Sequence, residues 1–294
     1  MERNKPIKTP DAILCGDFHL REDQPICRTD NFEEKQWEKL DYIKRLQVKY
    51  NIPYILHSGD LFHHWKASPY LLSKTIEHLP KNFYSVTGNH DLPQHSMELL
   101  NKSSINTLQV AGAIKILDGC HFGQTPEKGF TSIVIKGRKI LVWHILTYQG
   151  TKPFPGAEGG MAEGILRKYP QYDLIVTGDN HCSFTVEYQG RRLINPGNLT
   201  RQTADQADFQ PRVALWYSED NSIEWVNLPI QKDVISRDHL QVKEQRDARI
   251  DAFVSSLNGD YKTEMSFEQN LDSFLKVNPV RESVKSIIYK AIEI

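Results

Sequence analysis

Aspartate, histidine and asparagine side chains recur directly after short apolar runs of this sequence. The candidate metal ligands among them are Asp17, His19, Asp60, Asn89, His144, Asp179 and His181. Carboxylates, imidazoles and an amide oxygen form a mixed, fairly hard ligand set without cysteine, which favours manganese, iron or zinc over a thiolate site. The set exceeds the needs of one ion, but two ions ~3.5–4 Å apart that share one carboxylate would use all of it.

A pair of metal ions at this spacing binds a phosphate group and lowers the pKa of a bridging water. The chemistry expected of the ligand set is therefore hydrolysis of a phosphate ester. His90 directly follows Asn89. We expect it at the rim of the site, where it would protonate the leaving alkoxide or stabilise charge on the phosphoryl oxygens. Asp91 is expected to orient His90.

These ligands are far apart in the sequence, so the strands that precede them must end close together for one site to form. The stretch Phe83–Asp91, FYSVTGNHD, passes from apolar and β-branched residues to polar ones at Gly88, which lets the backbone turn sharply. Similar strands are expected at residues 12–15, 54–57, 140–143 and 174–176. Because ligands of an α/β sheet bind outside the carboxyl ends of its strands, five strand ends would bring these side chains to one spot.

The spacing of apolar residues defines the remaining elements. It predicts a helix from Phe32 to Tyr50, and Ser68-Pro69 marks the start of another through about Leu79. Short strands follow between about residues 114 and 228. The pattern predicts an α/β fold, a four-layer α-β-β-α sandwich, as a catalytic domain at residues 1–235. Residues 236–294 are expected to form a small helical appendage that is either an intramolecular cap or a segment that docks a partner.

Composition limits the classes of function. The 294 residues are 25% charged and 39% hydrophobic, with a net charge of -1, which is typical of a soluble globular protein and argues against coating nucleic acid by bulk positive charge. Four cysteines without CxxC spacing argue against a disulfide framework. No signal peptide or long apolar span is evident, so a cytoplasmic location without a membrane contact is expected.

The ordered motifs resemble those of the metallophosphoesterase (calcineurin-like) superfamily over about residues 11–228. They are Asp17-x-His19, Gly59-Asp60, Gly88-Asn89-His90-Asp91, a lone His144 and Gly178-x-x-His181. Any one motif is weak, but the whole series at strand ends is specific. The segments Ser58–His63 with Ser68-Pro69, and Asn195–Arg201, further resemble those of the SbcD family of DNA double-strand-break nucleases.

This resemblance implies a manganese-dependent DNA exonuclease and endonuclease of DNA repair or recombination, with magnesium, iron or zinc as alternative metals. One ion would be held by Asp17, His19, Asp60 and His181, and the other by Asp60, Asn89, His144 and Asp179. His90 takes the catalytic position and His63 matches another histidine near the site, whereas Arg201 is expected to bind substrate. The implied partners are DNA and an SbcC-like SMC-type ATPase, and a homodimer is compatible with the resemblance.

Two features depart from the SbcD pattern. The last motif of that family reads Gly-His-x-His, whereas this chain has Asp179 at the first histidine position. A carboxylate there would shift preference toward manganese or magnesium, or one metal would be lost. The helical segment is also shorter than the capping domain of the family. A small-molecule phosphodiesterase or protein phosphatase, and a weakly active scaffold that binds DNA or an ATPase, therefore remain alternative functions.

Overall fold

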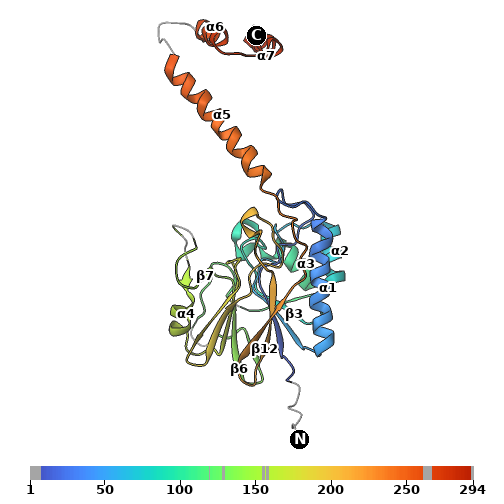
Figure 1. Cartoon of the computed structure of the whole chain (residues 1–294). Coiled ribbons are helices and arrows are strands. Elements are labelled where there is room, and N and C mark those ends of the chain that lie inside the picture. Colours follow the sequence, from blue (N-terminus) through green and yellow to red (C-terminus); the bar gives the residue numbers. More distant parts are fainter. Residues whose placement is uncertain are drawn as a thin grey trace. The chain divides into compact units, whose positions relative to one another are not determined.

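The computed structural model of the chain describes residues 8–118, 120–127, 130–153, 156, 159–260 and 267–292. The chain divides into two compact units, Met1–Ser236 and Arg237–Ile294. The larger unit contains two sheets and the helices that flank them (Figure 1). All the candidate metal ligands lie in this unit.

The first sheet has six strands in the order β13-β12-β1-β2-β3-β4. Their bounds are β1 (Ala12–Cys15), β2 (Tyr54–His57), β3 (Phe83–Ser85), β4 (Lys115–Ile116), β12 (Arg212–Tyr217) and β13 (Ser222–Asn227). Strands β1 to β4 pair in parallel, with Ala12 opposite Tyr54 and Ile55 opposite Phe83. Strands β12 and β13 join antiparallel to this group. The carboxyl ends of β1, β2 and β3 consequently meet at one edge.

The second sheet has five strands in the order β10-β11-β9-β6-β5, and β7 and β8 form a separate pair. Their bounds are β5 (Ile133–Ile135), β6 (Arg138–Trp143), β7 (Thr147–Tyr148), β8 (Gly160–Met161), β9 (Leu174–Thr177), β10 (Phe184–Tyr188) and β11 (Arg191–Asn195). Strands β6, β9 and β11 run in parallel, so β6 and β9 also end at a common edge. All five strands expected to precede metal ligands are present, within two residues of their predicted bounds.

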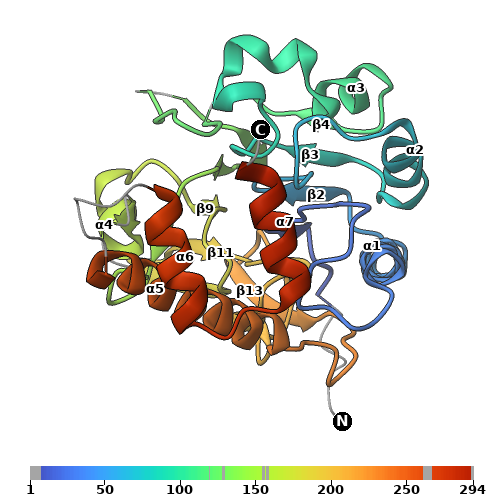
Figure 2. The same cartoon turned by 90° about the horizontal axis from the view of Figure 1, so that it is seen from above.

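Helices cover the outer face of each sheet. They are α1 (Phe32–Tyr50), α2 (Pro69–His78), α3 (Ser104–Val110) and α4 (Ala162–Lys168), with 3₁₀ turns η1 (Pro93–His95), η2 (Met97–Lys102) and η3 (Ala204–Gln206). Asn31 and Ser68 cap α1 and α2 by accepting hydrogen bonds from the amides of Glu34 and Leu71. Helices α1, α2 and α3 lie on one side of the sheets and α4 on the other (Figure 2).

Three apolar cores separate the layers, and the alternation of side chains along each strand assigns residues to them. In β1, Ile13 faces the helices α1 to α3, whereas Leu14 faces the second sheet. In β6, Val142 faces the first sheet and Leu141 faces α4. The order of layers is therefore helix, sheet, sheet, helix. The predicted four-layer α/β sandwich is confirmed.

The smaller unit consists of helices α5 (Asp238–Asp260), α6 (Phe267–Val277) and α7 (Glu282–Ile292). The predicted small C-terminal helices are thus present. Leu275 is buried, and the Tyr289 hydroxyl of α7 donates a hydrogen bond to the Asp272 carboxylate of α6. In the described part of the chain, no helix combines the length and the apolar character that crossing a membrane requires.

The segments after β1 and β11, strands of different sheets, pack tightly together at Gly16 and Gly197. A Cβ atom placed on Gly16 would lie 2.0 Å from the carbonyl oxygen of Gly197. The amide of Leu199 also donates to the carbonyl of Asp17 at 2.8 Å. The absence of a side chain at Gly16 therefore lets backbone pack on backbone where the first ligand begins.

We predict that Gly16→Ala destabilises the protein by at least about 2 kcal/mol, because the added methyl group forces two backbones apart. The measurement is urea unfolding followed by circular dichroism. Gly164→Ala is the matched control, because its Cβ would meet no atom within 4 Å and the residue lies in α4. Equal unfolding free energies for the two variants would contradict this account of Gly16.

Candidate metal centre

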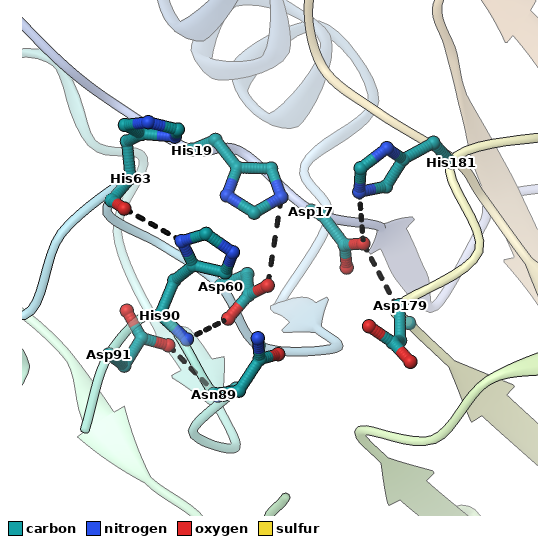
Figure 3. A network of polar contacts seen from close by, with 12 residues as sticks. Asp17, His19, Asp60, His63, Asn89, His90, Asp91, Asp179 and His181 are labelled. Atoms are coloured by element: carbon teal, nitrogen blue, oxygen red, sulfur yellow. Dashed lines mark hydrogen bonds and ion pairs between the residues drawn. The ribbon is translucent and has the colours of Figure 1, made fainter. Parts of the chain in front are cut away.

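The loops after β1, β2, β3, β6 and β9 bring the seven predicted ligands together. Figure 3 labels all of them except His144. Burial differs among them. Asp17, His19, Asp60 and His144 are buried, Asn89 and Asp179 are half-buried, and His181 is exposed. The group is thus anchored in the protein interior on one side and reaches solvent on the other.

Asp60 lies at the centre of the group. Its Oδ2 atom is 3.6 Å from Nε2 of His19 and 3.6 Å from Nε2 of His144. Its Oδ1 atom accepts a hydrogen bond from the amide of His90 at 2.9 Å, which fixes the orientation of the carboxylate. One oxygen therefore stands midway between two histidines, the position that a bridging carboxylate requires.

Asp17, His19 and His181 form one half of the ligand set. One ligand atom from each lies within 4.8 Å of the others, and Asp17 Oδ2 is 3.9 Å from His181 Nε2. Oδ1 of Asp17 and both ring nitrogens of His19 are buried and make no hydrogen bond within the described residues. Because an unsatisfied buried polar atom costs free energy, these atoms fit direct ligands of a metal ion.

Asn89, His144 and Asp179 form the other half. Nε2 of His144 is 3.1 Å from Oδ1 of Asn89 and 3.9 Å from Oδ1 of Asp179. The opposite ring nitrogen, Nδ1, contacts the backbone carbonyl of Ser58 at 2.8 Å. A carbonyl only accepts, so Nδ1 carries a proton, which leaves Nε2 as the nitrogen that a metal ion would bind.

The electrostatics of the site reflect three carboxylates in a buried space. Burial raises the pKa of Asp17 well above its usual value, and the charges of Asp60 and Asp179 add to the effect. Burial alone would lower the pKa of His144, but the carboxylates of Asp60, Asp17 and Asp179 outweigh it and raise this pKa to about 9. A concentration of negative charge around a buried imidazole is what divalent cations would neutralise.

Three ligand residues have left-handed backbone conformations. The φ angles are 47° at His19, 55° at Asp60 and 64° at Asp179. The carbonyl of Asp60 accepts hydrogen bonds from the amides of Phe18 and His19 at 3.0 and 2.9 Å, so these two loops support each other. Sparsely populated φ values of non-glycine residues that cluster in this way are typical of functional sites.

His90 and His63 lie beside the ligands. Nδ1 of His90 donates to the carbonyl of His63 at 2.7 Å, and the two rings stack with centroids 5.4 Å apart (Figure 3). The ring of His90 is also 4.8 Å from that of His19. Since Nδ1 is engaged by a carbonyl, Nε2 is the atom of His90 that is free to exchange a proton with a substrate.

Asp91 does not orient the His90 ring, contrary to the sequence-based expectation. Its Oδ2 accepts from the amides of Gly88 and Leu61 at 3.0 and 3.2 Å, and its Oδ1 accepts from Phe62 at 3.1 Å. Burial, and then the charge of Asp60, raises the pKa of Asp91 to about 7. The carboxylate therefore joins the loops after β2 and β3, and the carbonyl of His63 takes the orienting role.

Arg201 is also placed differently from the expectation. Its guanidinium is buried and donates to the carbonyls of Ala207 and Gln231 at 2.7 and 2.5 Å. Its own carbonyl accepts from the guanidinium of Arg28 at 2.9 Å. Two of its guanidinium nitrogens are thus engaged by the protein, so Arg201 holds the chain together behind the metal ligands and is not a contact for substrate at the metal centre.

Two supporting residues were not anticipated from the sequence. Ser58 acts through its backbone carbonyl on His144, and His95 donates from Nδ1 to the carbonyl of Asn89 at 2.9 Å. A carbonyl has no side-chain signature, and His95 lies in the 3₁₀ turn η1 without a recognisable motif. Only the folded geometry reveals these contacts.

The chain was compared with known protein families and solved structures. The family model of calcineurin-like phosphoesterases matches residues 12–183. Similar solved structures include an archaeal phosphodiesterase (16% identity, 74% of this chain and 99% of that chain, TM-score 0.44), Vps29 of Cryptosporidium parvum (17%, 76% and 100%, 0.36) and a protein of Thermus thermophilus (12%, 75% and 100%, 0.46). No curated protein matches the sequence significantly.

The family match spans more than half of the chain and includes all seven predicted ligands, so the protein belongs to the calcineurin-like phosphoesterases. It is a metal-dependent phosphoesterase. The family uses divalent metal ions, and the unsatisfied atoms of Asp17 and His19 fit that requirement. At these identities and TM-scores, the solved structures do not define a substrate.

We predict that Asp91→Asn destabilises the protein by about 1–3 kcal/mol, because the amide nitrogen cannot accept and leaves at least one buried backbone amide unpaired. Urea unfolding in EDTA measures the effect without a contribution from metal binding. Asp23→Asn is the control, because within the described residues the hydrogen bonds and the ion pair of this exposed carboxylate go to Arg21. If Asp91→Asn lost turnover but kept the stability of wild type, Asp91 would have a catalytic role and not a structural one.

Proposed function

We propose that this phosphoesterase is a manganese-dependent DNA exonuclease and endonuclease of SbcD type that acts with an SbcC-like ATPase in DNA repair or recombination. The observation that carries the proposal is the pair His63 and His90. The two rings stack beside the metal ligands, and one hydrogen bond joins the two residues. The SbcD resemblance implies this pair: His90 at the catalytic position and His63 as another histidine near the site.

The exposure of the ligands supports a large substrate. The side chains of Asp179 and His181 are 34% and 45% exposed, whereas that of His144 is fully buried. Because one side of the site is open to solvent, a phosphodiester within a long polymer can reach the ligands while the rest of the polymer stays outside. A small metabolite, in contrast, is usually held in a cavity that buries most of its surface.

The composition of the ligand set supports manganese. Oxygen ligands come from Asp17, Asp60, Asp179 and Asn89, and nitrogen ligands from His19, His144 and His181. Asp179 adds a carboxylate where the SbcD pattern has an imidazole. Hard oxygen donors suit manganese and magnesium better than softer ions, and the imidazoles favour manganese of these two.

The residues divide the proposed reaction among them. Divalent ions bound by the two halves of the ligand set would polarise the phosphoryl group and activate water. The His63 carbonyl and the Asp60 carboxylate fix the ring and the backbone of His90. His90 then delivers a proton from Nε2 to the leaving oxygen, a step that requires its imidazolium form.

The smaller unit supports an ATPase partner. Val277 at the end of α6 is 80% exposed and Ile287 of α7 is 67% exposed, and Val284 of α7 is exposed as well. Val284 and Ile287 are three residues apart on α7 and so lie on one face of this helix. Exposed apolar side chains on one helical face indicate an interaction site. We propose that this surface docks the SMC-type ATPase, with DNA as the shared substrate and with a homodimer of this chain in the complex.

Cleavage of linear duplex DNA by the purified protein in manganese tests the function. We expect degradation that EDTA abolishes and that Asp60→Ala loses, because both halves of the ligand set share Asp60. Asp220→Ala, which removes an exposed carboxylate paired with Lys8, serves as the matched surface control. Bis-p-nitrophenyl phosphate is assayed in parallel. If the protein hydrolyses this small ester but leaves DNA intact, it is a small-molecule phosphodiesterase and not a nuclease. If it binds metal but cleaves neither substrate, the alternative of a weakly active scaffold that binds DNA or an ATPase is favoured.

For His90→Asn we expect a loss of turnover of about 100-fold or more, the usual contribution of a general acid. The backbone amide that binds Asp60 is retained, so manganese should raise the melting temperature of the variant as it does for wild type. His64→Asn, in the same loop as His63 and without contact to a ligand, should keep its turnover. Unchanged cleavage by His90→Asn would remove His90 from the mechanism.

A further inference from the structure

A second concave site lies between α1 and the chain segments that follow β11 and β13. Its volume is about 110 Å³, and it is lined by Arg28, Lys35, Glu38, Lys39, Arg201 and residues 229–231. None of these residues belongs to the metal centre. The volume is several times the roughly 30 Å³ share of one water molecule in the liquid, so a small polyatomic ion fits.

Lys39 is the unusual member of this cavity. The residue is only 4% exposed, yet its ammonium group makes neither a hydrogen bond nor an ion pair with any residue in the described part of the chain. Burial, and then the charges of Arg28 and Arg201, lowers its pKa to about 8. Asp30 and Glu38 act on Lys39 through space, but neither accepts a hydrogen bond from it. A largely buried ammonium group without a hydrogen-bond acceptor is unfavourable, and an anion bound in the cavity would supply that acceptor.

The surrounding charges do not supply that anion. Arg28 is paired with Asp30 at 2.8 and 2.6 Å, and Lys35 with Glu38 at 2.7 Å. The guanidinium of Arg201 is hydrogen-bonded only to backbone carbonyls, which carry no net charge. Asp208 acts on Arg201 through space without a hydrogen bond. Four cations thus face three carboxylates, so one net positive charge remains, and the ammonium group of Lys39 makes no direct bond to any of these carboxylates.

We propose that this cavity is a binding site for a phosphoryl group, separate from the metal centre. A phosphoryl anion matches the net positive charge of this cavity. Its tetrahedral oxygens can accept from the three ammonium protons of Lys39 and from the guanidinium protons of Arg201 that the carbonyls leave free. Guanidinium groups together with a lysine are the side chains that proteins use most for phosphate recognition.

The cavity is connected to the metal centre by the chain on either side of Arg201. The side chain of Gln202 donates to the carbonyl of His19 at 3.2 Å, and the amide of Leu199 donates to the carbonyl of Asp17 at 2.8 Å. A phosphoryl group bound to Arg201 would therefore also stabilise residues 199–202, which hydrogen-bond to the loop of Asp17 and His19.

Phosphate binding to the full-length protein in EDTA tests the proposal, because without metal the catalytic site cannot retain phosphate. Equilibrium dialysis with labelled inorganic phosphate gives the affinity, and melting temperatures are compared in phosphate and in chloride at equal ionic strength. The variants are Lys39→Met, which removes the charge but keeps the length, and Lys49→Met, an exposed position on the same helix.

We expect wild type and Lys49→Met to bind one phosphate and to melt at a higher temperature with it. Lys39→Met should bind at least about 10-fold more weakly, the value of a charged hydrogen bond. In chloride it should be as stable as wild type or more stable, because the unpaired charge is gone. Equal phosphate binding by wild type and Lys39→Met, or no binding by either, would overturn the proposal.

Two further ligands distinguish the source of the phosphoryl group. A duplex DNA oligonucleotide and adenosine 5′-monophosphate are titrated into the same variants in EDTA. Weaker DNA binding by Lys39→Met would identify a backbone phosphate of nucleic acid, and weaker binding of the nucleotide or of inorganic phosphate alone would identify a small free anion. Because no cleavage is measured, this result does not depend on the nuclease activity.

Discussion

Hydrogen bonds from backbone amides to buried carboxylates hold this molecule's metal centre in place. The amide of Asp179 binds Asp17, the amide of His90 binds Asp60, and three amides bind Asp91. Each of these carboxylates links loops from different strands. Burying carboxylates is costly, and amides that cannot move away offset part of the cost by favouring the charged form. The sheets supply those amides because their parallel strands end at a common edge.

Glycines allow this arrangement to be compact. A Cβ on Gly88 would lie 2.0 Å from the carboxylate of Asp60, and one on Gly178 would lie 2.6 Å from that of Asp17. The backbone therefore packs directly against charged oxygens, which a side chain would prevent. The sandwich core behind these loops is apolar on every layer, so the loops rest on a rigid support. Ligand geometry depends on this packing as much as on the ligands themselves.

The sequence predicted the structure best where one stretch carries both the pattern of a buried strand and the residues of the turn that follows it. Apolar runs that end in a polar residue located β1, β2, β3, β6 and β9 and the side chains that gather after them. A glycine precedes the polar residue in every case except β6, so strand and turn leave separate signals. Asp91 and Arg201 look like site residues in sequence, but their partners are backbone groups of other segments of the chain. The short helix α3 was not anticipated either, since seven residues carry little periodicity. Most of these contacts join segments that are far apart in the sequence, so the residues next to Asp91 or Arg201 give no sign of them.

The left-handed backbone at position 179 has an evolutionary consequence. Among residue types that are able to ligate a metal, aspartate, asparagine and histidine adopt this conformation most readily, whereas glutamate and cysteine gain no such advantage. The backbone conformation therefore limits which ligand residues can replace Asp179 without strain. Histidine and aspartate can replace each other at this position, so the metal preference of the site can change during evolution while the fold stays the same.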